Sequence, residues 1–356
     1  SYWNMINNQE HFVRLYINEQ FFGVYNRTWR LDESLLINSG RLPGVFFRLE
    51  PQSKRNFYIG NFLSWYIPQA WEVKGSSKSE AHNLLNQPFK IAQETLGWNT
   101  QPNQDKEYLK QRLMILNEYF DPESFAKYLA IICHSGENHI DNQHNNAFWM
   151  DSISGKLIPI LMDAEGYDWR SWNEHLFRPI LKNSGAVVQA WLMNPLNQAL
   201  YINKLNELTL TFGSAPKIEK MIRSKWAEIQ NDVIADRHLS KTGSPRDFLP
   251  VKESDSLVEK LIEFTRQRTS WIRQQLTSDR VSISHRWKSG FELYLEGFSG
   301  TRVSRRDGKN FQLGNSTEFA TSFELLPATT TLRTTGLSTL YKTPRSYAFY
   351  ELPGQP

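Results

Sequence analysis

Two short polar segments concentrate side chains that could hold a metal ion or orient a proton. The first, HIDNQHNN at residues 139–146, follows an apolar run and contains Asp141 and, five residues later, Asn146. The second, MDAEG at residues 162–166, contains Asp163 and Glu165. Carboxylate and amide oxygens are ligands of the kind that Mg²⁺ prefers, and one more carboxylate can align a hydroxyl for phosphoryl transfer.

The residues between the two polar segments predict a hairpin that makes the order of the segments informative. AFWM and LIPILM flank DSISGK at 151–156, which predicts a hairpin. A loop with Asp and, five residues on, Asn, then a hairpin, then a metal-binding Asp is the order in protein kinases. Taken alone, the first segment is also typical of a polar loop whose Asp and Asn make turn hydrogen bonds. The hairpin and the second Asp favour the kinase interpretation, because a hairpin brings carboxylates at its two ends close together.

A helix is predicted to lead into the first segment. Asp121-Pro122 is a typical helix start, with Asp as the N-cap and Pro in the first turn. The apolar residues that follow at three- and four-residue spacing, which mark one buried face, are Phe125, Tyr128, Leu129 and Ile132. Further helical patterns occur in residues 78–120 and 185–280.

The N-terminal region carries strand patterns. Residues 11–29 alternate apolar and polar residues around Asn18-Glu19-Gln20, which predicts a hairpin with its turn there, and residues 44–50 form a third strand pattern. We therefore expect residues 1–60 to form one small, mostly antiparallel sheet.

Composition limits the function classes. The net charge of +4 over 356 residues is a mild excess that does not indicate the clustered basic face expected for nucleic-acid binding, so nucleic acid is not an expected partner. No apolar run is long enough to predict a membrane span. The single cysteine, Cys133, excludes an intramolecular disulfide and disfavours cysteine-ligated zinc. The compartment stays open: the chain begins with Ser1, and export or a cell-surface location with the signal removed is one alternative.

Three segments, in order, resemble the spore-coat H (CotH) kinase family, an atypical branch of the protein-kinase-like fold. The segments are VRLYINEQFFGVYNRTWRLDESLL, FDPESFAKYLAIICHSGENHIDNQHNNAFWMDSISGKLIPILMDAEGYDW and FTRQRTSWIRQQL. The likeness covers roughly residues 11 to 278. It implies transfer of the γ-phosphoryl of ATP, with Mg²⁺ or Mn²⁺, to a protein Ser/Thr or another hydroxyl-bearing acceptor.

The resemblance also implies roles for individual residues. Asp141 would be the catalytic aspartate, with His139 bracing its loop. Asp163 would bind the metal, and Asn146 would be a metal ligand or would organise the loop. Glu165 falls where the family often has a second Asp, and its longer side chain would move a metal ligand.

Two positions depart from the family pattern. The family's phosphate-binding lysine is replaced by Arg48, which keeps the charge but presents a larger, planar fork. Lys54 would take that role if the register differs. Trp29 stands where family members usually carry an acidic residue.

The expected fold is α+β: a bilobal protein-kinase-like domain over 1–280, with an N-lobe of about 1–120, a C-lobe of about 121–280, and a small β-rich domain over 281–356. Two alternatives stay open because of Arg48 and Trp29. One is a catalytically inactive pseudokinase or surface binding module on the same fold. The other is a kinase-fold transferase that moves a nucleotidyl group.

Overall fold

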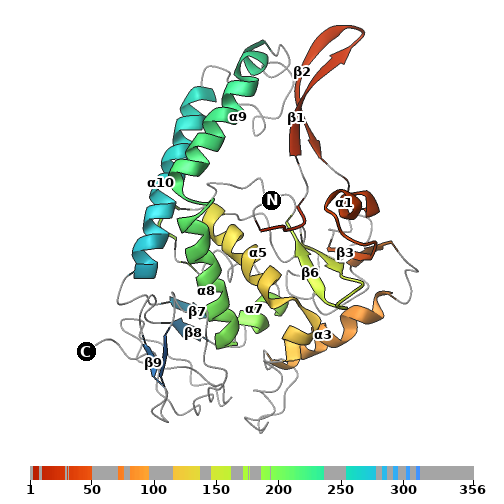
Figure 1. Ribbon diagram of the computed structural model, residues 1–356, viewed down its shortest axis with the longest axis vertical. Coiled ribbons are helices and arrows are strands. Elements are labelled where there is room, and N and C mark those ends of the chain that lie inside the picture. The colour runs from red at the N-terminus through yellow and green to blue at the C-terminus, as the bar shows by residue number, and fades with distance from the viewer. Residues whose placement is uncertain are drawn as a thin grey trace.

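The computed structural model contains both helices and strands (Figure 1). It describes residues 3–7, 10–28, 30, 32–49, 71–75, 81–95, 115–136, 146–161, 171–174, 176, 186–192, 194–235, 254–277, 283–286, 292–295, 302–304 and 310–312. The mixed content confirms the predicted α+β class.

Four antiparallel strands form one sheet, in the order β4-β3-β5-β6. Its strands are β3 Val45–Leu49, β4 Trp71–Lys74, β5 Asn146–Met150 and β6 Leu157–Ile160. The predicted β5–β6 hairpin is confirmed. Its turn is stabilised by the Asp151 carboxylate, which accepts hydrogen bonds from the backbone and hydroxyl of Ser154.

The prediction of one sheet over residues 1–60 is wrong. β1 Glu10–Ile17 and β2 Gln20–Thr28 form a separate two-stranded sheet, while β3 pairs with β4 and β5. The predicted first hairpin itself is confirmed, with Asn18-Glu19 as its turn and Gln20 already in β2. Alternation identifies a strand but not its partner. β3 presents buried residues to both sides of the sheet, so it takes an interior position beside a strand distant in sequence.

Helices cover the two faces of the sheet unequally. The helices are α1 Glu33–Asn38, α3 Asn83–Thr95, α5 Pro122–Ser135, α7 Ala186–Leu192, α8 Pro195–Leu210, α9 Ala215–Ala235 and α10 Ser254–Thr277. Phe47 and Phe148 lie in the large core with residues of α3, α5, α7 and α8. Phe46 and Trp149 lie on the opposite face, in a smaller cluster with residues of α1.

The predicted start and buried face of α5 are confirmed. The Asp121 side chain accepts a hydrogen bond from Ser124 N at 2.8 Å, and Pro122 opens the helix. The four residues predicted to face the core are all buried: Phe125, Tyr128, Leu129 and Ile132. Gly136, with φ of 71°, ends the helix in the left-handed conformation that glycine adopts without strain.

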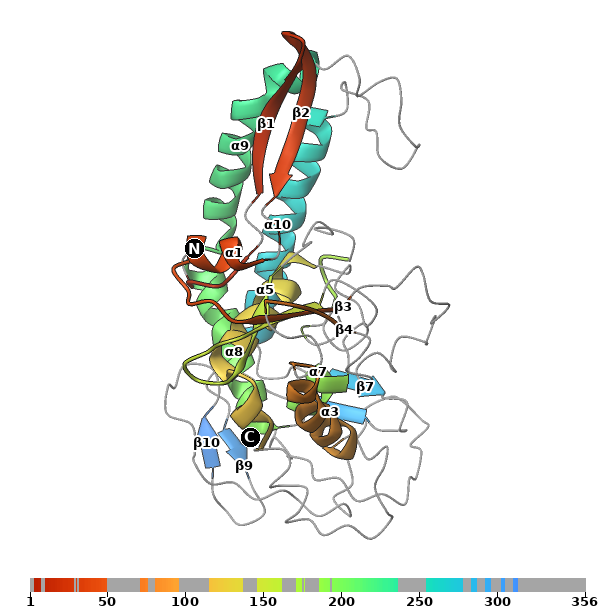
Figure 2. The same ribbon diagram turned by 90° about the vertical axis from the view of Figure 1, so that its right-hand side faces the viewer.

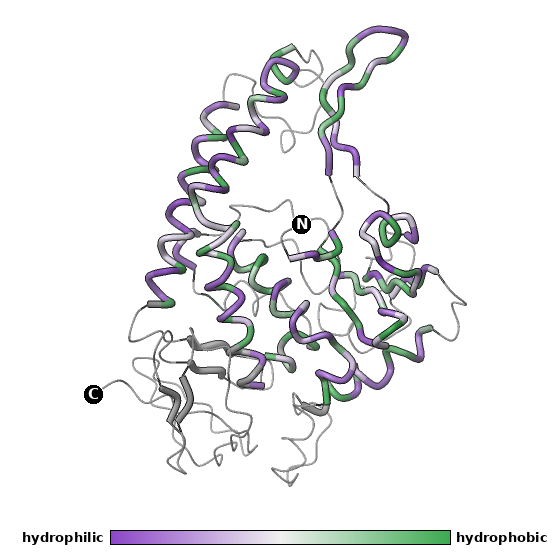
Figure 3. The backbone as a smooth tube through the Cα atoms, viewed as in Figure 1, coloured by the Kyte–Doolittle hydropathy of each residue, from purple (hydrophilic) through white to green (hydrophobic). Residues whose placement is uncertain are grey.

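A second region, which we call the arm, consists of β1, β2, α9 and α10 (Figures 1 and 2). None of the residues of α9 is buried. Figure 3 shows hydrophilic and hydrophobic residues alternating along α9 and α10, whereas β6 is largely hydrophobic. Helix α10 also reaches the core, to which it contributes Ile272 and Leu276.

Among the residues that the structure describes, the proposed boundary at residue 120 does not separate two cores. Both the four-stranded sheet and the large core contain residues from either side of position 120. Beyond residue 281 the structure describes two antiparallel strand pairs, β7 Ile283–Arg286 with β8 Glu292–Leu295 and β9 Arg302–Ser304 with β10 Asn310–Gln312. The division into two lobes and a β-rich domain stays a prediction. Within the part of the chain that the structure describes, no helix is both long and apolar enough to cross a membrane.

Candidate active site

The structure describes two of the predicted site residues, Arg48 and Asn146. The other five lie outside the described residues, and their roles stay predictions: Lys54, His139, Asp141, Asp163 and Glu165. The site is therefore built from the strand and helix ends to which these residues are attached.

One end of the four-stranded sheet gathers the ends of three strands. Leu49, the last residue of β3, lies opposite Asn146, the first residue of β5. Ala147 in turn lies opposite Ile160, the last residue of β6. The segment with Asp141 therefore enters the sheet, and the segment with Asp163 leaves it, at the end where β3 carries Arg48.

Arg48 and Asn146 project from opposite faces of the sheet. Arg48 is directly opposite Ala147 on one side and Glu72 on the other, so these three side chains share the face covered by α1. Asn146 is opposite Leu49 and faces the large core. With 5% of its surface exposed, Asn146 is a buried polar residue at the start of its strand.

Glu72 places an acidic side chain beside Arg48 on the same face of the sheet, which the sequence did not indicate. Directly opposite side chains in an antiparallel pair have Cβ atoms about 5 Å apart. The Glu72 carboxylate also lies 3.6 Å from the Lys74 ammonium. The half-buried Arg48 thus belongs to a charged set on two neighbouring strands.

The last turn of α5, which leads toward Asp141, is held by α10. The Cys133 carbonyl accepts hydrogen bonds from Arg268 Nε at 3.1 Å and Nη2 at 2.8 Å. His134 Nε2 lies 3.2 Å from Thr269 Oγ1. Burial, with a further effect of the Arg268 charge, lowers the pKa of His134 to about 4, so its imidazole is neutral at pH 7.

The segment that follows the Asp163 region is held by α10, α8 and α5. Arg268 Nη1 donates to the Trp172 carbonyl at 3.1 Å and to the Glu174 carbonyl. The Leu176 carbonyl accepts from Tyr201 at 2.7 Å and from the Cys133 thiol. Burial raises the pKa of that thiol, which keeps it protonated and makes it a poor nucleophile.

The sequence pattern did not indicate a role for Arg268 in this region. It sits in FTRQRTSWIRQQL, a segment noted only for a periodic apolar face and a family likeness. One sequence feature could have indicated this role: a charged residue lies within the apolar stripe of a predicted helix. Arginine is rarely fully buried unless its donors are satisfied, so such a residue is expected to have specific hydrogen-bond partners.

A comparison with protein families matches residues 4–272 to the model described as CotH kinase protein. The chain belongs to the CotH kinase family. The matched region runs from before β1 into α10, so it contains Arg48, Asn146 and Arg268. A search of curated proteins found no match to this chain.

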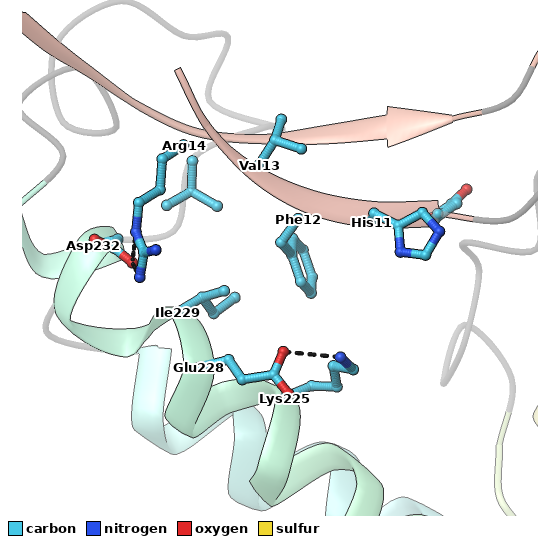
Figure 4. A pocket seen from close by; sticks show the side chains of 10 residues that line it. His11, Phe12, Val13, Arg14, Lys225, Glu228, Ile229 and Asp232 are labelled. Atoms are coloured by element: carbon cyan, nitrogen blue, oxygen red, sulfur yellow. Dashed lines mark hydrogen bonds and ion pairs between the residues drawn. The ribbon is translucent and has the colours of Figure 1, made fainter. Parts of the chain in front are cut away.

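A cavity of about 420 Å³ lies away from these residues, between the β1–β2 hairpin and α9 (Figure 4). Its arginine and its lysine each pair with a carboxylate of the lining: Arg14 lies 2.7 Å from Asp232, and Lys225 lies 2.8 Å from Glu228. Since these cations already have carboxylate partners, the cavity offers little for phosphate groups, and we do not assign the CotH active site to it.

Proposed function

We propose that this CotH family member is a kinase that transfers the γ-phosphoryl of ATP to a protein serine or threonine, or to another hydroxyl-bearing acceptor. The observation that carries the proposal is the convergence of strand ends. The segment that contains Asp141 and the segment that contains Asp163 are both attached to the end of the sheet where Arg48 lies. Phosphoryl transfer needs the hydroxyl-orienting carboxylate, the metal-binding carboxylate and a phosphate-binding cation near one another.

The residue types available at this end of the sheet fit a nucleotide and a divalent metal. Asp163 and Glu165 would supply oxygen donors, which suit Mg²⁺ or Mn²⁺. When bound, the metal ion neutralises charge on the phosphates. Arg48 can donate two parallel hydrogen bonds to a phosphate, and Glu72, opposite on the same face, would hold the guanidinium in place.

The remaining residues would act on the acceptor. Asp141 would accept a hydrogen bond from the acceptor hydroxyl and align its oxygen for attack, and His139 would brace the loop that carries Asp141. The burial of Asn146 on the core face favours the loop-organising part of its predicted role. A phosphate bound by Arg48 would lie toward the opposite face.

The kinase-like arrangement in two lobes, about 1–120 and 121–280, belongs to the proposal as well. Because strands from both sides of residue 120 share one sheet, the nucleotide would bind at the sheet end, where the two parts of the chain meet. The charge and shape of Arg48 favour one second candidate, transfer of a nucleotidyl group, since an arginine fork holds phosphates differently from a lysine ammonium.

Mass spectrometry separates these functions. The protein is incubated with ATP and Mg²⁺ or Mn²⁺, alone and with casein as a general acceptor, and the adducts are weighed. A phosphate adduct that disappears in Asp141→Ala but persists in Asp232→Ala, an arm carboxylate, is the expected result. A nucleoside monophosphate adduct would instead support nucleotidyl transfer. No adduct, together with no nucleotide binding, would leave the pseudokinase or binding-module alternative.

A further inference from the structure

The side chain of Arg268 connects two segments that are distant in sequence. It is 0% exposed, and its guanidinium donates to the Cys133 carbonyl in the last turn of α5. The other side of the guanidinium donates to the carbonyls of Trp172 and Glu174. One planar group therefore bridges the chain that leads toward Asp141 and the chain that comes from Asp163.

We propose that Arg268 is a positioning residue that sets the separation of the two catalytic segments of the CotH active site. The proposal rests on the proposed kinase function for its catalytic consequence, but the bridge itself is a property of the fold. Arg268 does not touch substrate in this account. It acts by holding the backbone from which the Asp141 and Asp163 segments extend.

The surroundings of Arg268 explain why an arginine is needed. The last carbonyls of a helix lack partners within the helix and carry partial negative charge, so a cation there is favourable. Cys133 O lies in this last turn; it accepts a 3.4 Å hydrogen bond from the C-cap Gly136 N–H and shorter ones from Nε and Nη2 of Arg268. The third nitrogen, Nη1, is left to reach the segment 172–174. A lysine has one ammonium and no fixed fork, so it cannot satisfy both segments with the same geometry.

Neighbouring contacts make the bridge stiff. Thr269, the next residue of α10, lies within hydrogen-bond distance of His134, next to Cys133. Tyr201 of α8 and Cys133 both donate to the Leu176 carbonyl. The two segments are thus anchored to α8 and α10 on either side of Arg268. The Cys133 thiol, a weak donor, also links them through Leu176, and loss of the guanidinium removes the charged group that joins the backbone at Cys133 to the backbone at 172–174.

The test compares Arg268→Met, Arg268→Lys and the matched control Arg266→Met. Arg266 lies on the same helix two residues away, but it is half exposed and pairs with Glu219 of α9. Amide hydrogen exchange is followed in the last turn of α5 and in residues 171–176. Turnover per folded molecule is measured well below each melting temperature, with kcat and the KM for ATP determined separately.

We expect Arg268→Met to exchange faster in both segments together, while Arg266→Met does not. Displaced catalytic groups cost about tenfold to a hundredfold in rate. We therefore expect kcat to fall by about that factor in Arg268→Met, while the KM for ATP changes by less than about threefold. Arg268→Lys should recover part of kcat, and it keeps the test available if Arg268→Met does not fold.

Two results would overturn the proposal. In one, the kcat of Arg268→Met per folded molecule equals that of wild type although its melting temperature falls, which would make the bridge purely structural. In the other, exchange accelerates in only one segment or in neither. If wild type itself transfers no phosphate, the proposed kinase function fails, and the exchange experiment still decides whether Arg268 couples the two segments.

Discussion

Helices α5 and α9 each carry one apolar face, yet α5 is enclosed and α9 has no buried residue. In the core, Phe125 of α5 lies against the rings of Phe120, Phe148 and Trp191. In the arm, α9 lies beside α10 and the β1–β2 hairpin and exposes Met221 and Ile234. An amphipathic pattern thus predicts a helix, but it does not determine how completely the apolar face is covered.

Different interactions hold the two regions. In the arm, Arg223 pairs with Glu219 and Glu259, and Arg266 pairs with Glu219. Hydrogen bonds from these arginines lower the pKa of both carboxyl groups, but solvent screens such exposed pairs and makes each of them weak. The core is held by apolar burial. Truncating a core side chain should therefore cost more stability than removing an exposed ion pair between α9 and α10.

Truncating a core aromatic should give the largest effect. Phe125→Ala leaves a cavity among the four rings of Phe120, Tyr128, Phe148 and Trp191, and we expect it to lower the free energy of unfolding by about 3–5 kcal/mol. Met221→Ala on α9, where the side chain is 57% exposed, should stay within about 0.5 kcal/mol of wild type. Denaturant unfolding monitored by circular dichroism measures both. Equal losses would mean that the arm is packed as tightly as the core.

Lowering the pH should weaken the core before it weakens the arm. His134 has a pKa of about 4 in the folded protein, below its ordinary value of 6.5, so the unfolded state binds more protons between these values. The free energy of unfolding is therefore unaffected by His134 above pH 6.5, and it falls by roughly 3 kcal/mol in total as the pH drops toward 4 and below. The arm carboxylates Glu219 and Glu259 have lowered pKa values, so their pairs weaken only below about 4.5.

Denaturant midpoints between pH 7 and pH 4 test this order. His134→Asn should have a flatter profile than wild type over that range. A wild-type profile that stays flat down to pH 4.5 would contradict the burial of a neutral histidine in the core.

Relieving strain in the arm should give a smaller, local gain. Asn18 and Glu19 at the β1–β2 turn have φ of 49° and 68°, and Glu lacks the tolerance of Gly or Asn for this region. Glu19→Gly should stabilise the hairpin by about 1 kcal/mol, seen as slower amide exchange in residues 10–28. Asn18→Gly is the matched control and should change exchange less. Faster exchange in Glu19→Gly would show that another contact sets the turn.

Removing an arm ion pair should have the smallest effect. Glu219→Gln breaks the pairs with both Arg223 and Arg266, yet global unfolding should be nearly unchanged. Amide exchange in α9 should be faster in Glu219→Gln than in wild type at low salt, and the two proteins should exchange equally at high salt. A cooperative loss of stability in the core would show that the arm is coupled to it.

The sequence predicted local features well and long-range pairings poorly. Asp121-Pro122 and the apolar spacing that followed were enough for α5, and DSISGK was enough for the β5–β6 hairpin. The pairing of β3 with β5 was missed, because alternation carries no information about a partner about 100 residues away. That pairing is what brings Arg48 to the sheet end from which the Asp141 and Asp163 segments extend.

The candidate site was predictable in residue type but not in geometry. Arg48 and Asn146 were named from the family likeness, but their positions on opposite faces follow only from the register. The roles of Glu72 and Arg268 were not predicted because they depend on tertiary contacts. For Glu72 the contact is a cross-strand pair with Arg48, and for Arg268 it is a set of hydrogen bonds to three backbone carbonyls.

Thermal unfolding with ATP and either Mg²⁺ or Mn²⁺ tests the proposed nucleotide site most directly. Ligand that binds only the folded state stabilises it by about 2.7 kcal/mol at a hundredfold excess over the dissociation constant. We predict a metal-dependent rise in melting temperature for wild type and for the arm control Asp232→Ala, and none for Asp163→Ala. No rise at millimolar ATP with either metal, or an equal rise in Asp163→Ala, would contradict the account.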